Sequence, residues 1–266
     1  SRFQSLDAVL ALPDPLGALK EAQEAAKPSI PWSSIDRAPG PTTAHRLPPL
    51  EAAEVWAAGA TYPHREEDRI AQSAQAGDFY ESVFKADRPE LFLKATAHRV
   101  VGPQAPIRLR ADSTKDVPGP ELALVLSPSL RVVGFTVGND VSSRSLEGEN
   151  PLYLPQAKIY DGCCALGPAI LMAEPDIDPL KLDVRLIIRR NNVEIFEGFV
   201  STSQMTRKLE DLIAYLGRDN SFPKGAVLLT GTGVIAPADF SLQDGDFVEI
   251  SIPTIGTLRN PVVRGS

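Results

Sequence analysis

The chain has 266 residues, 43 % of them apolar, which is enough for one large domain or for a small domain joined to a larger one. Its 34 acidic and 27 basic side chains give a net charge of −7, which argues against a nucleic acid partner, because phosphate backbones are held by clustered Lys and Arg. No apolar run is long enough to span a bilayer, and residues 1–15 lack the basic start and apolar core of a secretion signal, so we expect a cytoplasmic protein that has no contact with a membrane.

The first 50 residues are predicted to form a small appendage. Asp14 can cap a short helix that Pro15 opens and that continues over residues 17–26. Residues 27–50 are rich in Pro and Ser, which indicates an ordered but irregular connection. His45 lies in this connection and is interpreted as a surface histidine.

A strand is predicted over residues 55–62, and a helix or two short helices over residues 65–86, where apolar residues recur at near-helical spacing. Arg65 lies at the junction between the two. A charged run at a helix start is commonly a solvated first turn. Arg65 is nevertheless a candidate clamp for a substrate carboxylate, because a guanidinium can bind both carboxylate oxygens.

A second strand is predicted over residues 91–95, where Leu91, Leu93 and Ala95 alternate with Phe92 and Lys94. Glu90 and Lys94 flank its apolar LFL. Periodicity alone leaves two interpretations of Glu90 open, a general base and the polar edge of a strand.

Residues 118–168 carry the strongest functional pattern. The segments ELALVL and RVVGFTVGNDV predict an antiparallel hairpin that is buried on both faces. Glu121 starts the first strand, Asp140 ends the second, and Lys158 follows 18 residues later. Asp140 alone could be a turn cap, but buried charges are costly unless they serve chemistry. The segment therefore predicts an active site for an acidic oxygen-rich substrate and a hard cation.

The remaining elements are predicted from local patterns. Residues 182–201 form a hairpin around Asn191 and Asn192, which tolerate the positive φ of a tight turn. A helix is expected from Ser203, as its cap, to Gly217, which stops it. The adjacent cysteines, Cys163 and Cys164, are interpreted as small buried apolar residues.

Six segments closely resemble the fumarylacetoacetate hydrolase superfamily, and within it the 2-keto-3-deoxyarabinonate dehydratase-like branch: RPELFLKATAHRVVGP, PELALVL, GFTVGNDVSSR, EGENPLYLPQAKIYDGCCALGP, LLTGTGV and IGTLRNPV. The resemblance implies an α+β fold, a mixed β-sandwich roll, with a small N-terminal domain over residues 1–85 and a catalytic domain over residues 86–266. It also implies a homodimer or homotetramer.

The resemblance implies a divalent cation, Mg²⁺ or Mn²⁺, held by a Glu-x-Glu pair and a later Asp. The second Glu falls on Glu121 and the Asp on Asp140, whereas Gly119 takes the place of the first Glu. Two carboxylates should hold a hard cation more weakly than three. A replacement ligand could come from Asp116, Glu147 or Glu149.

The resemblance also implies roles for other residues. Lys158, Glu90 and Arg65 are expected to be catalytic, and Thr232, Ser143 and Arg144 to bind substrate. The expected reaction is metal-assisted dehydration of a 2-keto-3-deoxy sugar acid through an enolate, which a cation and an ammonium group stabilise. The alternatives are a hydrolase, decarboxylase or isomerase acting on a 2-keto or 1,3-dicarbonyl acid, and a non-catalytic relative that has lost its metal.

Overall fold

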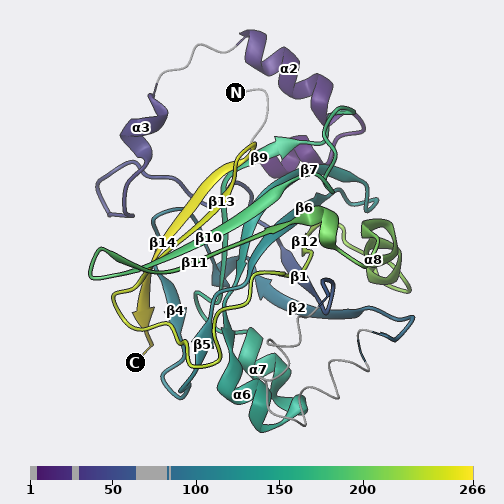
Figure 1. Cartoon of the computed structure of the whole chain (residues 1–266). Coiled ribbons are helices and arrows are strands. Elements are labelled where there is room, and N and C mark those ends of the chain that lie inside the picture. Colours follow the sequence, from purple (N-terminus) through teal and green to yellow (C-terminus); the bar gives the residue numbers. More distant parts are fainter. Residues whose placement is uncertain (1–4, 26–29, 64–82, 84, 266) are drawn as a thin grey trace.

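Two β-sheets pack face to face at the centre of the chain (Figure 1). The computed structural model describes residues 5–25, 30–63, 83 and 85–265. The main apolar core lies between the sheets, because alternate side chains of strands in both sheets point toward one another. The architecture is a mixed β-sandwich with few helices, as the sequence predicted.

The larger sheet contains the predicted central hairpin. Its seven strands are, in spatial order, β2 (Glu90–Thr96), β1 (Glu54–Gly59), β12 (Ala226–Leu229), β6 (Pro120–Leu126), β7 (Val132–Asp140), β9 (Cys164–Met172) and β3 (Val100–Val101). Every residue of β6 is buried. Leu122 and Leu124 face the core between the sheets, whereas Ala123 and Val125 face a second apolar cluster. Burial on both faces explains why β6 is almost continuously apolar.

The smaller sheet covers one face of the larger one. Its five strands are, in order, β11 (Val193–Ser201), β10 (Asp183–Arg190), β13 (Phe247–Ile252), β14 (Gly256–Arg264) and β4 (Ile107–Leu109). The predicted turn between β10 and β11 is confirmed, since Asn191 and Asn192 have φ values of 53° and 63°. A separate two-stranded sheet pairs β5 (Asp116–Val117) with β8 (Ser142–Ser143).

The helices among the described residues are short and lie outside the two sheets (Figure 1). They are α1 (Leu6–Leu10), α2 (Pro15–Ala25), α3 (Trp32–Ile35), α6 (Arg144–Glu149), α7 (Leu154–Lys158) and α8 (Leu209–Leu216). The predicted cap of α2 is confirmed, because the backbone N–H of Gly17 donates to Oδ1 of Asp14 at 2.9 Å. Helices α6 and α7 lie together at one end of the sheets (Figure 1). No described helix combines the length and apolar character that crossing a bilayer requires.

The helix near residue 210 starts later than the sequence predicts. It begins at Leu209 instead of following Ser203, because Thr202–Gln204 forms a separate 3₁₀ turn. The backbone N–H of Thr206 donates to the carbonyl of Thr61 at 2.8 Å, so this segment bonds to another loop instead of continuing a helix. Gly217 ends the helix as expected.

Strand β1 belongs to the larger sheet, although the predicted domain boundary after residue 85 assigned it to the N-terminal part. It pairs in parallel with β12 and antiparallel with β2. The sheet therefore already includes the strand that starts at residue 54. The helical segment predicted over residues 65–86 lies almost entirely outside the described residues. Cys163 and Cys164 are both buried and free, as expected.

Candidate active site

Asp140, the last residue of β7, lies at the centre of a buried cluster of charges. Its Oδ1 is 2.7 Å from Nζ of Lys94, and its Oδ2 is 2.9 Å from Nζ of Lys158. Burial alone would raise the pKa of Asp140, but the two ammonium groups outweigh burial and lower it to about 2. Asp140 is therefore an anion that orients two lysines.

Lys158 connects Asp140 to helix α6. Its ammonium donates to Oγ of Ser142 at 2.7 Å and lies 3.1 Å from Oε1 of Glu147. Arg144 binds the other oxygen of Glu147 at 2.7 Å. Burial tends to raise the pKa of Glu147, but Arg144 and Lys158 together keep it below its ordinary value. Glu147 is thus also held as an anion.

Local sequence signals explain how the segment EGENPLYLPQAK reaches this geometry. Ser143 caps α6, and its hydroxyl accepts from the backbone N–H of Leu146 at 3.4 Å. Asn150 caps the following 3₁₀ turn through the N–H of Leu152. A proline in the first turn of α7 fits a helix start. Lys158 ends α7, where a cation is favoured by the helix dipole.

Glu121, the second residue of β6, lies beside the end of β7. Its Oε2 accepts from the backbone N–H of Gly231 at 2.6 Å, and the backbone N–H of Asp140 donates to the carbonyl of Gly119 at 2.9 Å. Burial, followed by the negative charge of Asp140, raises the pKa of Glu121 well above its usual range. A nearby cation would relieve this repulsion.

Glu90 opens β2 and lies directly over Gly59 of β1, since a Cβ atom added to Gly59 would be only 1.9 Å from Oε2 of Glu90. Its carboxyl group is within electrostatic range of Lys158 and Glu147. Burial raises the pKa of Glu90, and the attraction of Lys158 opposes the rise only in part. Nζ of Lys158 lies 5.0 Å from the ring centre of Phe92, which is two residues from Glu90 on the same face of β2, so Glu90 lies near the cluster that holds Lys158.

The three residues expected to bind substrate differ in their surroundings. Ser143 is fully buried and donates to Oγ of Ser113 at 2.7 Å, in addition to capping α6. Arg144 binds Glu147 as described above. The hydroxyl of Thr232 accepts from the N–H of Val234 at 3.1 Å, on the loop whose Gly231 binds Glu121. Arg65, the predicted carboxylate clamp, lies outside the described residues.

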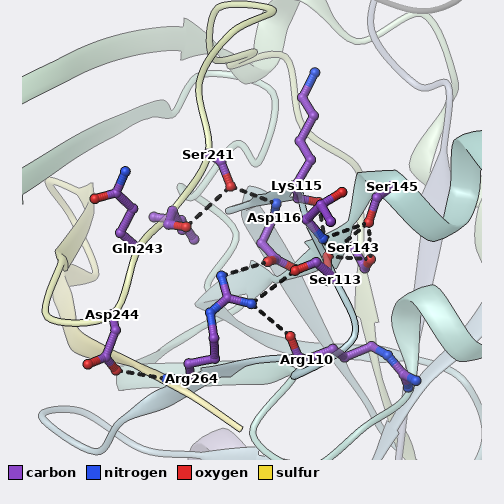
Figure 2. A network of polar contacts seen from close by, with 12 residues as sticks. Arg110, Ser113, Lys115, Asp116, Ser143, Ser145, Ser241, Gln243, Asp244 and Arg264 are labelled. Carbon is purple, nitrogen blue, oxygen red and sulfur yellow. Dashed lines mark hydrogen bonds and ion pairs between the residues drawn. The ribbon is translucent and has the colours of Figure 1, made fainter.

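Of the suggested replacement ligands, Asp116 belongs to a different network (Figure 2). Its carboxylate is 3.6 Å from the guanidinium of Arg264, which also donates to the carbonyls of Arg110 and Ser113 at 2.9 and 3.0 Å. Asp116 is fully buried, and neither carboxylate oxygen has a hydrogen-bond partner among the described residues. These contacts hold the end of β14 against β5, the strand that precedes β6.

The other two suggested replacement metal ligands are either paired with cationic side chains or exposed. Glu147 is bound by Lys158 and Arg144, and Glu149 is exposed. Gly119 itself is tightly packed, because an added Cβ atom would lie 2.7 Å from the carbonyl oxygen of Asp140. Glu121 and Asp140 are the other two carboxylates expected to bind a cation, and both oxygens of Asp140 already pair with Lys94 and Lys158.

The described residues offer only part of the coordination shell that a divalent cation needs. Within residues 5–25, 30–63, 83 and 85–265, no group of three or more His, Cys, Asp or Glu side chains is arranged to hold a metal ion. Magnesium commonly keeps several waters and uses only one or two carboxylates together with substrate oxygens. Glu121 and Asp140 would fit a magnesium site of that kind if Asp140 exchanged one lysine contact for the metal, but the described residues do not form a site made of protein ligands alone.

Sequence reasoning missed the importance of two charged residues of the cluster. Lys94 was noted only as a flank of the apolar LFL, and Glu147 only as a possible metal ligand. Lys94 sits between Leu93 and Ala95 in a strand whose neighbours are apolar. A lysine in such a position signals a buried charge with a dedicated partner.

A family model described as the fumarylacetoacetate (FAA) hydrolase C-terminal domain matches residues 54–263. A probable 2-keto-3-deoxyxylonate dehydratase of Haloferax volcanii is 49 % identical over 218 residues, which cover 82 % of this chain and 75 % of that protein. The 2-dehydro-3-deoxy-D-arabinonate dehydratase of Saccharolobus solfataricus is 46 % identical over 219 residues, covering 81 % and 74 % of the two chains.

Solved structures agree with these sequence matches. The apo form of 2-keto-3-deoxy-D-arabinonate dehydratase superposes with a TM-score of 0.85 and 38 % identity, covering 99 % of this chain and 90 % of that one. The same enzyme complexed with magnesium and 2,5-dioxopentanoate gives a TM-score of 0.82, also with 38 % identity, and covers 98 % and 90 %.

Proposed function

Since this chain belongs to the fumarylacetoacetate hydrolase family, we propose that it is a hydro-lyase that removes water from a 2-keto-3-deoxy sugar acid with the help of magnesium. The observation that carries the proposal is the buried ammonium of Lys158, fixed by Asp140 and Glu147 beside Glu90. Two relatives named as dehydratases, at 49 % and 46 % identity, support the reaction class.

The substrate type follows from the charges of the cluster. A 2-keto acid carries a carboxylate and a carbonyl oxygen side by side, and removal of its C3 proton places negative charge on the carbonyl oxygen. Lys158 would stabilise this developing charge, because a fixed ammonium in a site that excludes water needs little reorganisation during the reaction. Asp140 and Glu147 keep the ammonium in place.

Glu90 is proposed to move the proton. As a carboxylate it takes the proton from C3, and the electron pair of that C–H bond forms the enolate. When the enolate collapses, the bond from C4 to its hydroxyl breaks, and the protonated Glu90 returns its proton so that water leaves. A carboxyl group with a raised pKa suits both steps better than an ordinary one.

Glu121 and Asp140 are the residues that would hold magnesium, which when bound withdraws electron density from the substrate carboxylate and keto oxygens and acidifies the C3 proton. Substrate oxygens and water would complete the coordination, as the donor set requires. Burial and the charge of Asp140 raise the pKa of Glu121, and a bound cation would favour its ionised form.

A panel of 2-keto acids tests the proposal against other activities of the same chemistry. The purified protein is incubated with magnesium and, separately, with a 2-keto-3-deoxypentonate, oxaloacetate and an acylpyruvate, and products are identified by mass spectrometry. We expect the first compound to lose water, with the highest kcat/KM of the three. Decarboxylation of oxaloacetate or cleavage of the acylpyruvate, without dehydration of the pentonate, would contradict it.

A further inference from the structure

Lys94 is a second lysine at the site, and its side chain is completely buried. Its Nζ lies 2.7 Å from Oδ1 of Asp140 and donates to the backbone carbonyls of Val141 and Lys158, both at 2.6 Å. These contacts join β2 to the end of β7 and to the end of α7. We propose that Lys94 is a positioning residue that fixes Lys158 for catalysis, an inference that rests on the proposed function.

The geometry separates Lys94 from a catalytic role. An ammonium group has three N–H donors and no acceptor, and three oxygen atoms within 2.7 Å match them. With its donors committed and its side chain fully buried, Lys94 does not contact substrate. Lys158 also has at least three oxygen partners, but its side chain is 9 % exposed, against 0 % for Lys94, so exposure and not the number of contacts separates the two lysines.

Lys94 controls Lys158 at two points. It holds the backbone carbonyl of Lys158, one of the last carbonyls of α7, which has no partner within the helix. It also binds one oxygen of Asp140, while Lys158 binds the other. Nζ of Lys94 therefore positions both the backbone of Lys158 and the Asp140 carboxylate that binds the Lys158 ammonium.

A double-mutant cycle tests this coupling. Lys94→Met, Lys158→Met and the double variant are compared in kcat and KM for the 2-keto-3-deoxypentonate, and in affinity for oxalate in the presence of magnesium. Lys94→Met should lower kcat by about 10- to 100-fold, as loss of an orienting partner does, with a smaller change in KM. Combined with Lys158→Met it should cause little further loss, because Lys94 acts through Lys158.

A matched control separates positioning from stability. Arg190 makes an ion pair with the fully buried Asp246 at 2.7 Å, in the smaller sheet. Arg190→Met should lower Tm but leave kcat unchanged. The proposal is overturned if Lys94→Met lowers Tm but leaves kcat unchanged. It is also overturned if the fold-loss of kcat in the double variant equals the product of the fold-losses in the two single variants.

Two further outcomes are decisive. If Lys94→Met does not fold, Lys94→Gln is measured instead, because its amide keeps N–H donors for the two carbonyls. If neither variant folds while Arg190→Met does, Lys94 serves only the stability of the fold and the proposal is overturned. If the unaltered protein dehydrates no substrate, the proposed function fails. The oxalate affinities still test Lys94, because the same non-additive pattern is expected in binding.

Discussion

The ammonium nitrogen of Lys158 lies 2.9 Å from Oδ2 of Asp140, and both side chains are buried. Lys158→Met should therefore lower kcat by about 100- to 1,000-fold, the loss typical of removing one group that stabilises developing negative charge. Steady-state kinetics measure this. Lys181, which is 79 % exposed and pairs with Asp178, is the matched control: Lys181→Met should keep full activity, and an equal loss in both variants would contradict the assignment.

The second prediction concerns Glu90 and pH. Because burial raises its pKa above the ordinary 4.5, a Glu90 base becomes active only as pH rises through this higher value. The acidic limb of kcat/KM should therefore lie above pH 4.5. Glu90→Gln should lower kcat by about 100-fold or more and remove the limb, whereas Glu210→Gln, an exposed change on α8, should alter neither. Activity that rises as pH falls would instead assign Glu90 as the initial acid.

The third prediction concerns the close packing at Gly119. Gly119→Ala places a methyl group 2.7 Å from the backbone oxygen of Asp140, so the strand end must shift. We expect a loss of about 1–3 kcal/mol in the free energy of unfolding and weaker binding of magnesium with oxalate, measured by calorimetry. Gly148→Ala is the control, because nothing lies within 4 Å of its added Cβ. If the two variants have the same free energy of unfolding and the same affinity for magnesium with oxalate, the close packing at Gly119 is contradicted.

The fourth prediction uses the buried Asp116. Burial raises its pKa above the ordinary 3.8, and the partial opposition of Ser113 and Arg264 does not cancel the rise. The folded protein therefore holds this proton more tightly than the unfolded chain, so stability relative to Asp116→Asn should fall as pH rises from about 3.8 toward the folded pKa. Urea unfolding of both proteins at several pH values measures the difference. A difference that is constant or grows with pH would contradict the burial effect.

The sequence predicted the elements that depend on local signals. The continuous apolar runs of β6 and β7, the Asn191–Asn192 turn and the Asp14 cap all appear as expected, because each is decided by residues next to one another. The late start of α8 could not be predicted in this way. It depends on the hydrogen bond from Thr206 to Thr61, which are 145 residues apart.

At the site, too, features that depend on the local sequence could be predicted, whereas those that depend on tertiary packing could not. Glu121, Asp140, Lys158 and Glu90 could be proposed because each carries charge at the end of an apolar strand or in a distinctive string, and the structure brings them together. Ser143 was expected to bind substrate, but its hydroxyl caps α6 and bonds to Ser113. The neighbours of a hydroxyl depend on tertiary packing, which no local pattern contains.

The most direct test of the account is proton NMR of a 2-keto-3-deoxypentonate incubated with the protein and magnesium in D₂O. We expect the C4 CHOH signal to disappear and a C5 aldehyde signal to appear as 2,5-dioxopentanoate forms, the compound bound in the related dehydratase structure. Elimination of water across C3–C4 leaves a 2-keto-3-ene acid, and two tautomerisations that move hydrogen from C5 and its hydroxyl to C3 and C4 convert it to this product. Lys158→Met and chelation of the metal should both slow the conversion strongly. An unchanged spectrum with fully folded, magnesium-saturated protein would contradict a dehydratase.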